Sequence, residues 1–305
     1  MRLKRRQLLV GLGGMAALMV PRFSMAQTTV TMGEIEVTSV SDGSLVLPGS
    51  MFFDGLPEAE LAQVLQDANV AHDQLTPPCN LTLLRNGAQT VLFDAGSGSG
   101  FMPSAGQLLD SLDALDLSAD DITHVVFTHG HPDHLWGVLD DFDDTVFPNA
   151  QHMMGRVEWD YWRDPNTVDA IGTARASFAV GAARRLEAIE DQFTLFDAGQ
   201  EILPGVMAHG TYGHTPGHIS FEIRAGSDAL MVGGDAIGNH HIALARPAWE
   251  SGADQDPALA AQTRLRLLDQ ITHDQMLFLG FHIPGGGLGR LDRHNDSYRF
   301  IPEAM

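Results

Sequence analysis

The segment THGHPDHLWG, residues 128–137, places three imidazoles and one carboxylate within six positions. It directly follows residues 122–127, a run of mostly β-branched and aromatic residues that predicts a buried strand. A strand that ends in a tight loop can direct neighbouring side chains toward one point, and imidazole and carboxylate are the ligands that a zinc-type ion prefers. A polar loop that caps a helix is the alternative, but it gives the imidazoles no reason to crowd together. The segment therefore predicts a fold that gathers metal ligands at the end of a strand.

Three later loops offer the same chemistry, and each follows or joins predicted strands. The loop GHTPGHIS contains His214 and His218, MVGGDAIG contains Asp235, and LGFHIPG contains His282. Because the loops that follow strands meet at one edge of an open sheet, these side chains are expected to converge with the first segment.

Strands and helices alternate along the chain, which indicates an α/β (or α+β) class in one domain. The turn signal Asn86-Gly87 predicts a hairpin between two of the strands. Strands are expected at residues 30–40, 81–84, 90–93, 122–127, 206–209, 219–223, 229–232 and 276–279, and helices at residues 57–68, 108–115, 170–193 and 257–271.

The order, type and spacing of these polar residues resemble the metallo-β-lactamase superfamily, and so does TVLFDAGSG around Asp94. Within it the pattern is most similar to methyl parathion hydrolases and related lactonases and esterases, on HGHPDH, TYGHTPGH and the ending FHIPGGGLGRL. The resemblance implies a four-layer αβ/βα sandwich over residues 27–305, with a helical insertion around residues 156–193. It also implies two divalent metal ions, expected to be zinc: one held by His129, His131 and His218, the other by Asp133, His134 and His282, with Asp235 as the bridge.

The resemblance further implies hydrolysis by a metal-bridging hydroxide, with Asp133 and Asp235 as the catalytic carboxylates. Asp94 and His214 are expected to orient the ligands. A tyrosine proton donor is in doubt, because Gly238 stands where related lactonases often carry tyrosine. The expected substrate pocket consists of Trp136, Trp159, Trp162, His241 and Phe281.

The composition favours a neutral small-molecule substrate. Lys4 is the only lysine in the chain, and several aromatic residues lie near the motif loops. A neutral lactone or aryl ester is therefore predicted first and a phosphotriester second. A glyoxalase-II-like thioesterase or a β-lactamase remains the alternative, followed by a mononuclear iron dioxygenase and a metal-binding protein without catalysis.

Residues 1–26 have the basic start, apolar middle and small-residue end of a secretory signal peptide, with Arg5-Arg6 typical of the twin-arginine type. Cleavage near Ala26 would give a periplasmic or secreted protein. The segment carries five basic and no acidic residues, so the remainder has 13 basic against 39 acidic residues and a net charge of −26. Such a surface predicts no nucleic-acid partner and no stable membrane association, while a homodimer stays open.

Overall fold

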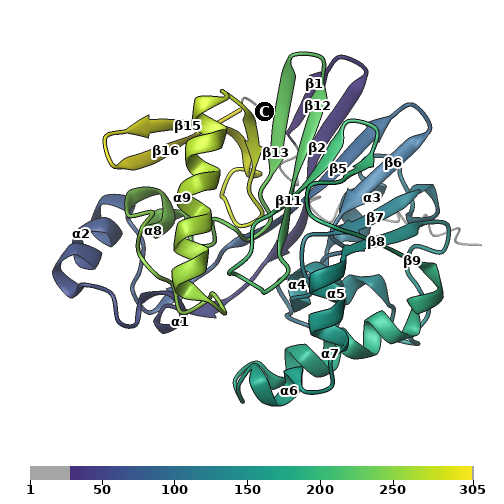
Figure 1. Ribbon diagram of the computed structural model, residues 1–305, viewed down its shortest axis with the longest axis horizontal. Helices are drawn as coiled ribbons and strands as arrows, with labels where there is room; N and C mark the ends of the chain where they lie inside the picture. The colour runs from purple at the N-terminus through teal and green to yellow at the C-terminus, as the bar shows by residue number, and fades with distance from the viewer. Residues whose placement is uncertain (1–27, 304–305) are drawn as a thin grey trace, which may run out of the picture.

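The computed structural model describes residues 28–303, in which two seven-stranded β-sheets pack face to face (Figure 1). The signal peptide predicted at residues 1–26 lies outside the described residues. The first sheet has the order β1-β2-β5-β6-β7-β8-β9 and the second the order β10-β11-β12-β13-β14-β15-β16. A third, two-stranded sheet pairs β3 with β4.

The first sheet consists of β1 (Thr29–Met32), β2 (Ile35–Ser44), β5 (Pro78–Asn86), β6 (Gln89–Phe93), β7 (His124–Phe127), β8 (Gln151–Gly155) and β9 (Phe193–Phe196). The second consists of β10 (Glu201–Leu203), β11 (Val206–Gly210), β12 (Ile219–Ala225), β13 (Asp228–Val232), β14 (Leu277–Leu279), β15 (Leu288–His294) and β16 (Ser297–Pro302). The small sheet consists of β3 (Leu47–Pro48) and β4 (Gln74–Leu75). Strands β6 to β9 are parallel to one another, as are β13 and β14, so their carboxyl ends share one edge of each sheet.

The helices are α1 (Ser50–Phe53), α2 (Glu58–Ala68), α3 (Leu108–Asp113), α4 (Pro132–Leu135), α5 (Arg156–Arg163), α6 (Thr167–Ala170), α7 (Ala176–Ala188), α8 (His240–Ala245) and α9 (Pro257–His273). Three 3-10 helices are η1 (Ala119–Asp121), η2 (Trp136–Val138) and η3 (Glu190–Gln192). Among residues 28–303, no helix combines the length and the apolar character needed to cross a membrane.

Alternation along the strands produces the layers. In β6, Val91 and Phe93 point into the core between the sheets, whereas Leu92 points into the core under the helices of the first sheet. In β13, Leu230 and Val232 point between the sheets. A strand whose two faces are both buried has a continuous run of apolar residues, and both of these strands have one.

Helices cover both outer faces, which completes the four-layer αβ/βα sandwich predicted from the sequence (Figure 1). Helices α3, α4, α5 and α7 contribute buried residues to the core on the first sheet, and α8 and α9 contribute theirs to the core on the second. Helices α1 and α2 pack in a smaller cluster that also includes Ile242 of α8.

Several element predictions need correction. Residues 30–40 form two strands instead of one, because Gly33 at φ +61° turns the chain between β1 and β2. Residues 170–193 form α7, η3 and the start of β9 instead of one helix. Gly172 at φ +88° lies before α7 and separates it from α6. The hairpin predicted at Asn86-Gly87 is confirmed by the pairing of β5 with β6.

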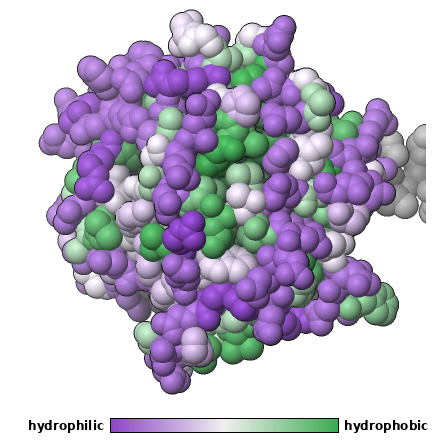
Figure 2. Space-filling view, turned by 45° about the vertical axis from the view of Figure 1, so that its right-hand side comes forward, coloured by the Kyte–Doolittle hydropathy of each residue, from purple (hydrophilic) through white to green (hydrophobic). Residues whose placement is uncertain are grey.

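The surface is predominantly polar, in keeping with the acidic composition. Figure 2 shows hydrophilic residues over most of the visible face, with hydrophobic residues in separate smaller areas. Of the exposed large hydrophobic residues in the described part of the chain, Phe142 is the most accessible at 85%.

Candidate metal centre

The motif loop after β7 places two histidines before one helical turn and an aspartate and a histidine on that turn. His129 follows the strand directly, and His131 caps the amino end of α4 in an extended conformation. Pro132 occupies the first helical position, where its missing N–H costs nothing, and it sets Asp133 and His134 on the first turn. The loop after β7 thus explains the tight spacing of the motif.

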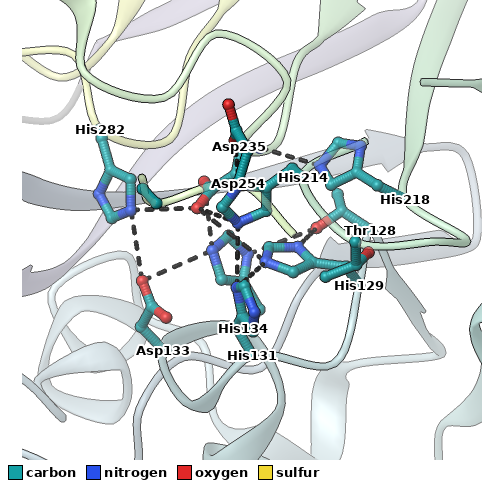
Figure 3. A network of polar contacts seen from close by, with 12 residues as sticks. Thr128, His129, His131, Asp133, His134, His214, His218, Asp235, Asp254 and His282 are labelled. Atoms are coloured by element: carbon teal, nitrogen blue, oxygen red, sulfur yellow. Dashed lines mark hydrogen bonds and ion pairs between the residues drawn. The ribbon is translucent and has the colours of Figure 1, made fainter. Parts of the chain in front are cut away.

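Two groups of ligand atoms form at this edge of the sandwich, each with its ligand atoms within 4.8 Å of one another. The first group is His129, His131, His214 and Asp235, and the second is Asp133, His134, Asp235 and His282. Figure 3 shows these side chains pointing toward one another, with Asp235 between the two groups.

Distances in the first group match those between ligands around one cation. His131 Nδ1 lies 3.0 Å from His129 Nε2 and 3.0 Å from His214 Nε2, and His214 Nε2 lies 3.3 Å from Asp235 Oδ2. Neighbouring ligand atoms of a tetrahedral zinc ion, at bonds of about 2.0–2.1 Å, lie about 3.3 Å apart. The three imidazoles and the carboxylate can therefore surround one ion.

The second group has similar spacing. His134 Nε2 lies 3.3 Å from Asp235 Oδ1 and 3.5 Å from Asp133 Oδ2. His282 Nε2 lies 3.4 Å from Asp133 Oδ2 and 3.3 Å from Asp235 Oδ2. Asp235 belongs to both groups, and this position is the one that a bridging carboxylate requires.

Unpartnered atoms support the assignment to metal ions. In the described part of the chain, Asp133 Oδ2, His134 Nε2 and Asp235 Oδ1 are buried ligand atoms that make no hydrogen bond of acceptable geometry. Burying a polar group without a partner is costly, so such atoms gathered at one place are the ones that metal ions would satisfy. The donor set of imidazole and carboxylate fits two divalent ions of the zinc type.

Other contacts fix the orientation of the imidazoles. His134 Nδ1 lies 2.7 Å from Oδ2 of Asp94, a residue expected from the sequence to orient the ligands. His282 Nδ1 lies 2.8 Å from the Pro78 carbonyl oxygen. His214 Nδ1 lies 2.9 Å from Asp254 Oδ1. A hydrogen bond at one ring nitrogen sets which nitrogen is free to bind a metal.

Asp254, which contacts His214, is a residue of the site that the sequence did not reveal. It lies in the loop before α9, and its second oxygen accepts a hydrogen bond from the buried guanidinium of Arg264 at 3.1 Å. No spacing relative to the motif identifies it, because only the packing of α9 brings it to His214.

The structure differs from the sequence-based ligand set at one position. His214, predicted as a supporting residue, belongs to the first group, whereas His218, predicted as a ligand, lies outside both groups. His218 Nε2 accepts a hydrogen bond from the Asp235 backbone N–H at 3.0 Å, and its Nδ1 lies 2.8 Å from Thr211 Oγ1. With both ring nitrogens engaged, His218 supports the loop that carries Asp235 (Figure 3).

The pKa values divide the imidazoles of the motif into two kinds, one neutral and one protonated. Burial, followed by neighbouring histidines, holds the pKa values of His129 and His131 well below their ordinary range, so both are neutral and ready to ligate. Burial also lowers the pKa of His134, but the carboxylates of Asp235, Asp133 and Asp94 raise it to about 10. A proton on His134 thus balances the charge of the neighbouring carboxylates, a role that a bound cation would otherwise take.

Four of the five residues predicted to form the substrate pocket do not line the cavity that reaches His282. Trp162 is buried, with 1% exposure, and its Nε1 donates to Glu158. Trp136 and Trp159 pack in the helical layer against Phe101 and Phe193, respectively. Phe281 is buried and stacks on His134 with ring centroids 3.8 Å apart. Large aromatic residues near the motif thus serve the core.

Of the five predicted pocket residues, His241 is the one that lines the cavity at the metal centre. This cavity has a volume of about 340 Å³ and reaches His282. Its lining is Phe52, Asn69, Val70, Ala71, Gln74, Leu75, Thr76, Pro77, Pro78, Gly238, Asn239, His240, His241, His282 and Pro284.

Solved structures with the same fold include hydrolases of related type. The chain is similar to the dizinc quorum-quenching lactonase AidC in complex with a product, with 27% identity, a TM-score of 0.85, and coverage of 92% of this chain and 98% of that chain. It is similar to the hydrolase AbOPH of the beta lactamase superfamily, with 25% identity, a TM-score of 0.83 and the same coverage. A probable metal-dependent hydrolase from Staphylococcus aureus shares the fold at 20% identity and a TM-score of 0.71, with coverage of 90% and 100%.

A search among curated proteins finds no match. The family model described as the metallo-beta-lactamase superfamily matches residues 76–282, which include both groups of ligand atoms. On this match, together with the sandwich and its two groups of ligands, the chain belongs to the metallo-beta-lactamase superfamily.

Proposed function

We propose that this chain is a two-metal hydrolase that cleaves a neutral ester-type bond, with lactones and aryl esters as preferred substrates and phosphotriesters second. The observation that carries the proposal is the cavity at His282. Among its described lining residues none is Asp, Glu, Lys or Arg. A substrate bound there meets no fixed charge other than that of the metal centre itself.

The cavity suits an apolar substituent next to a polar reacting bond. Phe52, Val70, Leu75, Pro77 and Pro78 supply apolar surface, and His282 marks the end that adjoins the metal centre. A volume of about 340 Å³ lies at the small end of the range for ligand pockets. The acyl or aryl part of an ester would bury its apolar surface here, with its carbonyl directed toward Asp235 and His282.

When bound, two divalent ions would supply a hydroxide nucleophile at neutral pH and a positive field at the ester oxygen. Asp235 reaches both groups of ligands, so its carboxylate would fix the spacing of the site and could accept a proton. Asp133 and His282 would face the leaving oxygen, because they belong to the group beside the cavity. No side chain is needed as nucleophile.

His240 and His241 would act as neutral polar groups in the cavity. Burial, with a contribution from His241, lowers the pKa of His240 to about 3, and burial lowers the pKa of His241. Neutral imidazoles can donate a hydrogen bond to the substrate without adding charge. This property suits an uncharged ester better than a carboxylate-bearing substrate.

The similarity to AidC supports a lactone among the possible substrates. That protein is a dizinc quorum-quenching lactonase, and it covers nearly the whole described chain at 27% identity. The exact lactone is not carried over, because the cavity-lining side chains decide chain length and shape.

Substrate comparison tests the proposal. The zinc-loaded protein is expected to hydrolyse a neutral lactone or p-nitrophenyl ester with kcat/KM at least tenfold above that for a β-lactam or a glutathione thioester, about 1.4 kcal/mol in transition-state binding. Chelation should abolish turnover and zinc should restore it. A tenfold preference for either anionic substrate, or activity that survives complete metal removal, would contradict the proposal.

A further inference from the structure

Helix α5 presents a buried acidic residue to the back of the metal centre. Glu158 is 0% exposed and Trp162 is 1% exposed on this short helix. The two residues are four apart, so they lie on the same face of the helix and point in the same direction. The other residues of α5 are exposed or half-buried, and a glutamate is rarely buried completely.

The carboxylate of Glu158 bonds to both loops that supply the first group of ligands. Its Oε1 accepts from the Gly130 N–H at 2.9 Å, and Gly130 stands between His129 and His131. Its Oε2 accepts from Thr215 Oγ1 at 2.7 Å and from the Gly217 N–H at 3.0 Å, and both residues belong to the loop of His214.

A fourth donor completes the arrangement. The indole Nε1 of Trp162 donates to Oε1 at 2.5 Å, so each carboxylate oxygen accepts two hydrogen bonds. Hydrogen bonds to an ionised acceptor are shorter and stronger than neutral ones. One side chain therefore satisfies donors from the motif loop, from the His214 loop and from its own helix.

Close approach of the backbone makes the position specific. A Cβ on Gly130 would overlap the indole nitrogen of Trp162, and a Cβ on Gly217 would overlap the backbone nitrogen of Glu158. Glycine at both positions lets α5 press directly against the two loops. One carboxylate is therefore in direct contact with both loops.

We propose that Glu158 is a positioning residue for the metal centre, which holds the His129–His131 loop and the His214 loop at the distance that one metal ion requires. The inference rests on the two-metal centre of the proposed function. Glu158 itself has no place in either group of ligands. It acts through the backbone on either side of the ligands, as orienting residues around metal sites do.

The replacement Glu158→Gln tests the role directly. Glutamine keeps the size of the side chain but has one acceptor oxygen, so its NH₂ group faces two donors and one loop loses its bonds. We expect a chelating dye to extract one of the two zinc ions about 10–100-fold faster than from the wild type, and the other at the wild-type rate. In the cobalt-substituted protein, the visible absorption of one ion should change.

A matched control separates positioning from loss of stability. Glu222 is also a buried glutamate, 4% exposed, but it lies on β12 and contacts His209 and Arg224. Glu222→Gln should lower the unfolding temperature without changing the release of either ion. Accelerated release in both variants would overturn the inference, because it would then report stability alone.

The variant Trp162→Phe provides a second test should Glu158→Gln fail to fold. It removes one donor to Glu158 and keeps an aromatic ring in the core, so extraction of the same single ion should accelerate less than in Glu158→Gln. Zinc release at the wild-type rate from Glu158→Gln, or from Trp162→Phe if only that variant folds, would overturn the positioning role. Because the variant would still bind two ions, this result would not contradict the two-metal centre. A wild-type protein that binds fewer than two ions would instead remove the two-metal centre itself.

Discussion

The two halves of the sandwich contribute to the metal centre in different ways. The first sheet supplies four of the candidate ligands from one loop, the segment after β7. The second sheet supplies His214, Asp235 and His282 from three separate loops, after β11, β13 and β14. The first half thus provides a compact set of ligands, and the second half closes the set from three directions.

This difference determines where the site depends on tertiary packing. The motif loop is organised by its own helical turn, by Asp94 and by Glu158, all from the first half of the sandwich. The loops of the second half are held by contacts from elsewhere: Asp254 orients His214, and the Pro78 carbonyl orients His282. Variants in the second half should therefore separate ligands from supporting residues most clearly.

The largest effect is expected at Asp235, the one residue shared by both groups. Asp235→Asn removes a negative charge that two cations would share, so kcat/KM should fall by more than about 100-fold, the upper range for residues that only orient a ligand. Metal analysis should show fewer than two ions per chain. Full occupancy together with full activity would contradict the assignment of Asp235 as the bridge.

The next effect distinguishes the two histidines of the HTPGH loop. His214→Ala should lose one ion and most activity, because His214 Nε2 lies 3.0 Å from His131 Nδ1 and 3.3 Å from Asp235 Oδ2. His218→Ala should retain two ions and lose about tenfold in activity through a looser Asp235 loop. The reverse pattern, with an ion lost only in His218→Ala, would restore the ligand set expected from the sequence.

The sequence predicted the first half of the site better than the second for a physical reason. In THGHPDH the ligands lie so close together that the chain itself brings them together, and their placement needs only a strand and a turn. In HTPGH, either histidine could reach the site, and the choice depends on which ring faces the Asp235 backbone N–H. Glu158 and Asp254 gave no local signal, because helices α5 and α9 bring them to the loops through packing.

The fold was predicted in the same uneven way. Strong turns and apolar strands such as the hairpin at Asn86-Gly87 were predicted correctly. Strands β15 and β16 were missed because their residues alternate with charged ones at the edge of the second sheet. Strand β8 was missed because its five residues, including His152, form no long apolar run.

We expect His152 to make the first half of the sandwich sensitive to acid. It is fully buried on β8 between Phe127 and Phe193, and neither ring nitrogen has a partner among the described residues. Burial lowers the pKa of His152 to about 4, below its ordinary 6.5. The pKa of His152 is thus lower in the folded protein than in the unfolded chain. The free energy of unfolding is therefore unaffected by this group above about pH 6.5, and it decreases as the pH falls from about 6.5 toward 4.

His152→Leu should remove this loss. At pH 5 the free energy of unfolding should rise relative to the wild type by about 2 kcal/mol more than it does at pH 8, as follows from the two pKa values. Denaturant unfolding at both pH values measures the difference, and contributions from metal binding cancel where both proteins share them. His294→Leu is the control, because His294 is exposed and solvated in both states. An equal change at both pH values would show that His152 does not contribute to acid sensitivity.

The smallest effect concerns a feature that the two halves share. Gly87 joins β5 to β6 in the first sheet at φ +59°, and Gly226 joins β12 to β13 in the second at φ +61°. Both lie in two-residue hairpin loops, and an added Cβ would meet no atom within 4 Å at either position. Gly87→Ala and Gly226→Ala should therefore each lower the free energy of unfolding by about 1 kcal/mol through backbone strain alone. Gly100→Ala is the matched control, because Gly100 is equally open but has no positive φ, and it should leave stability unchanged or raise it slightly. If only one of the two variants lost unfolding free energy, the two halves would differ in their turns as well as in their ligands.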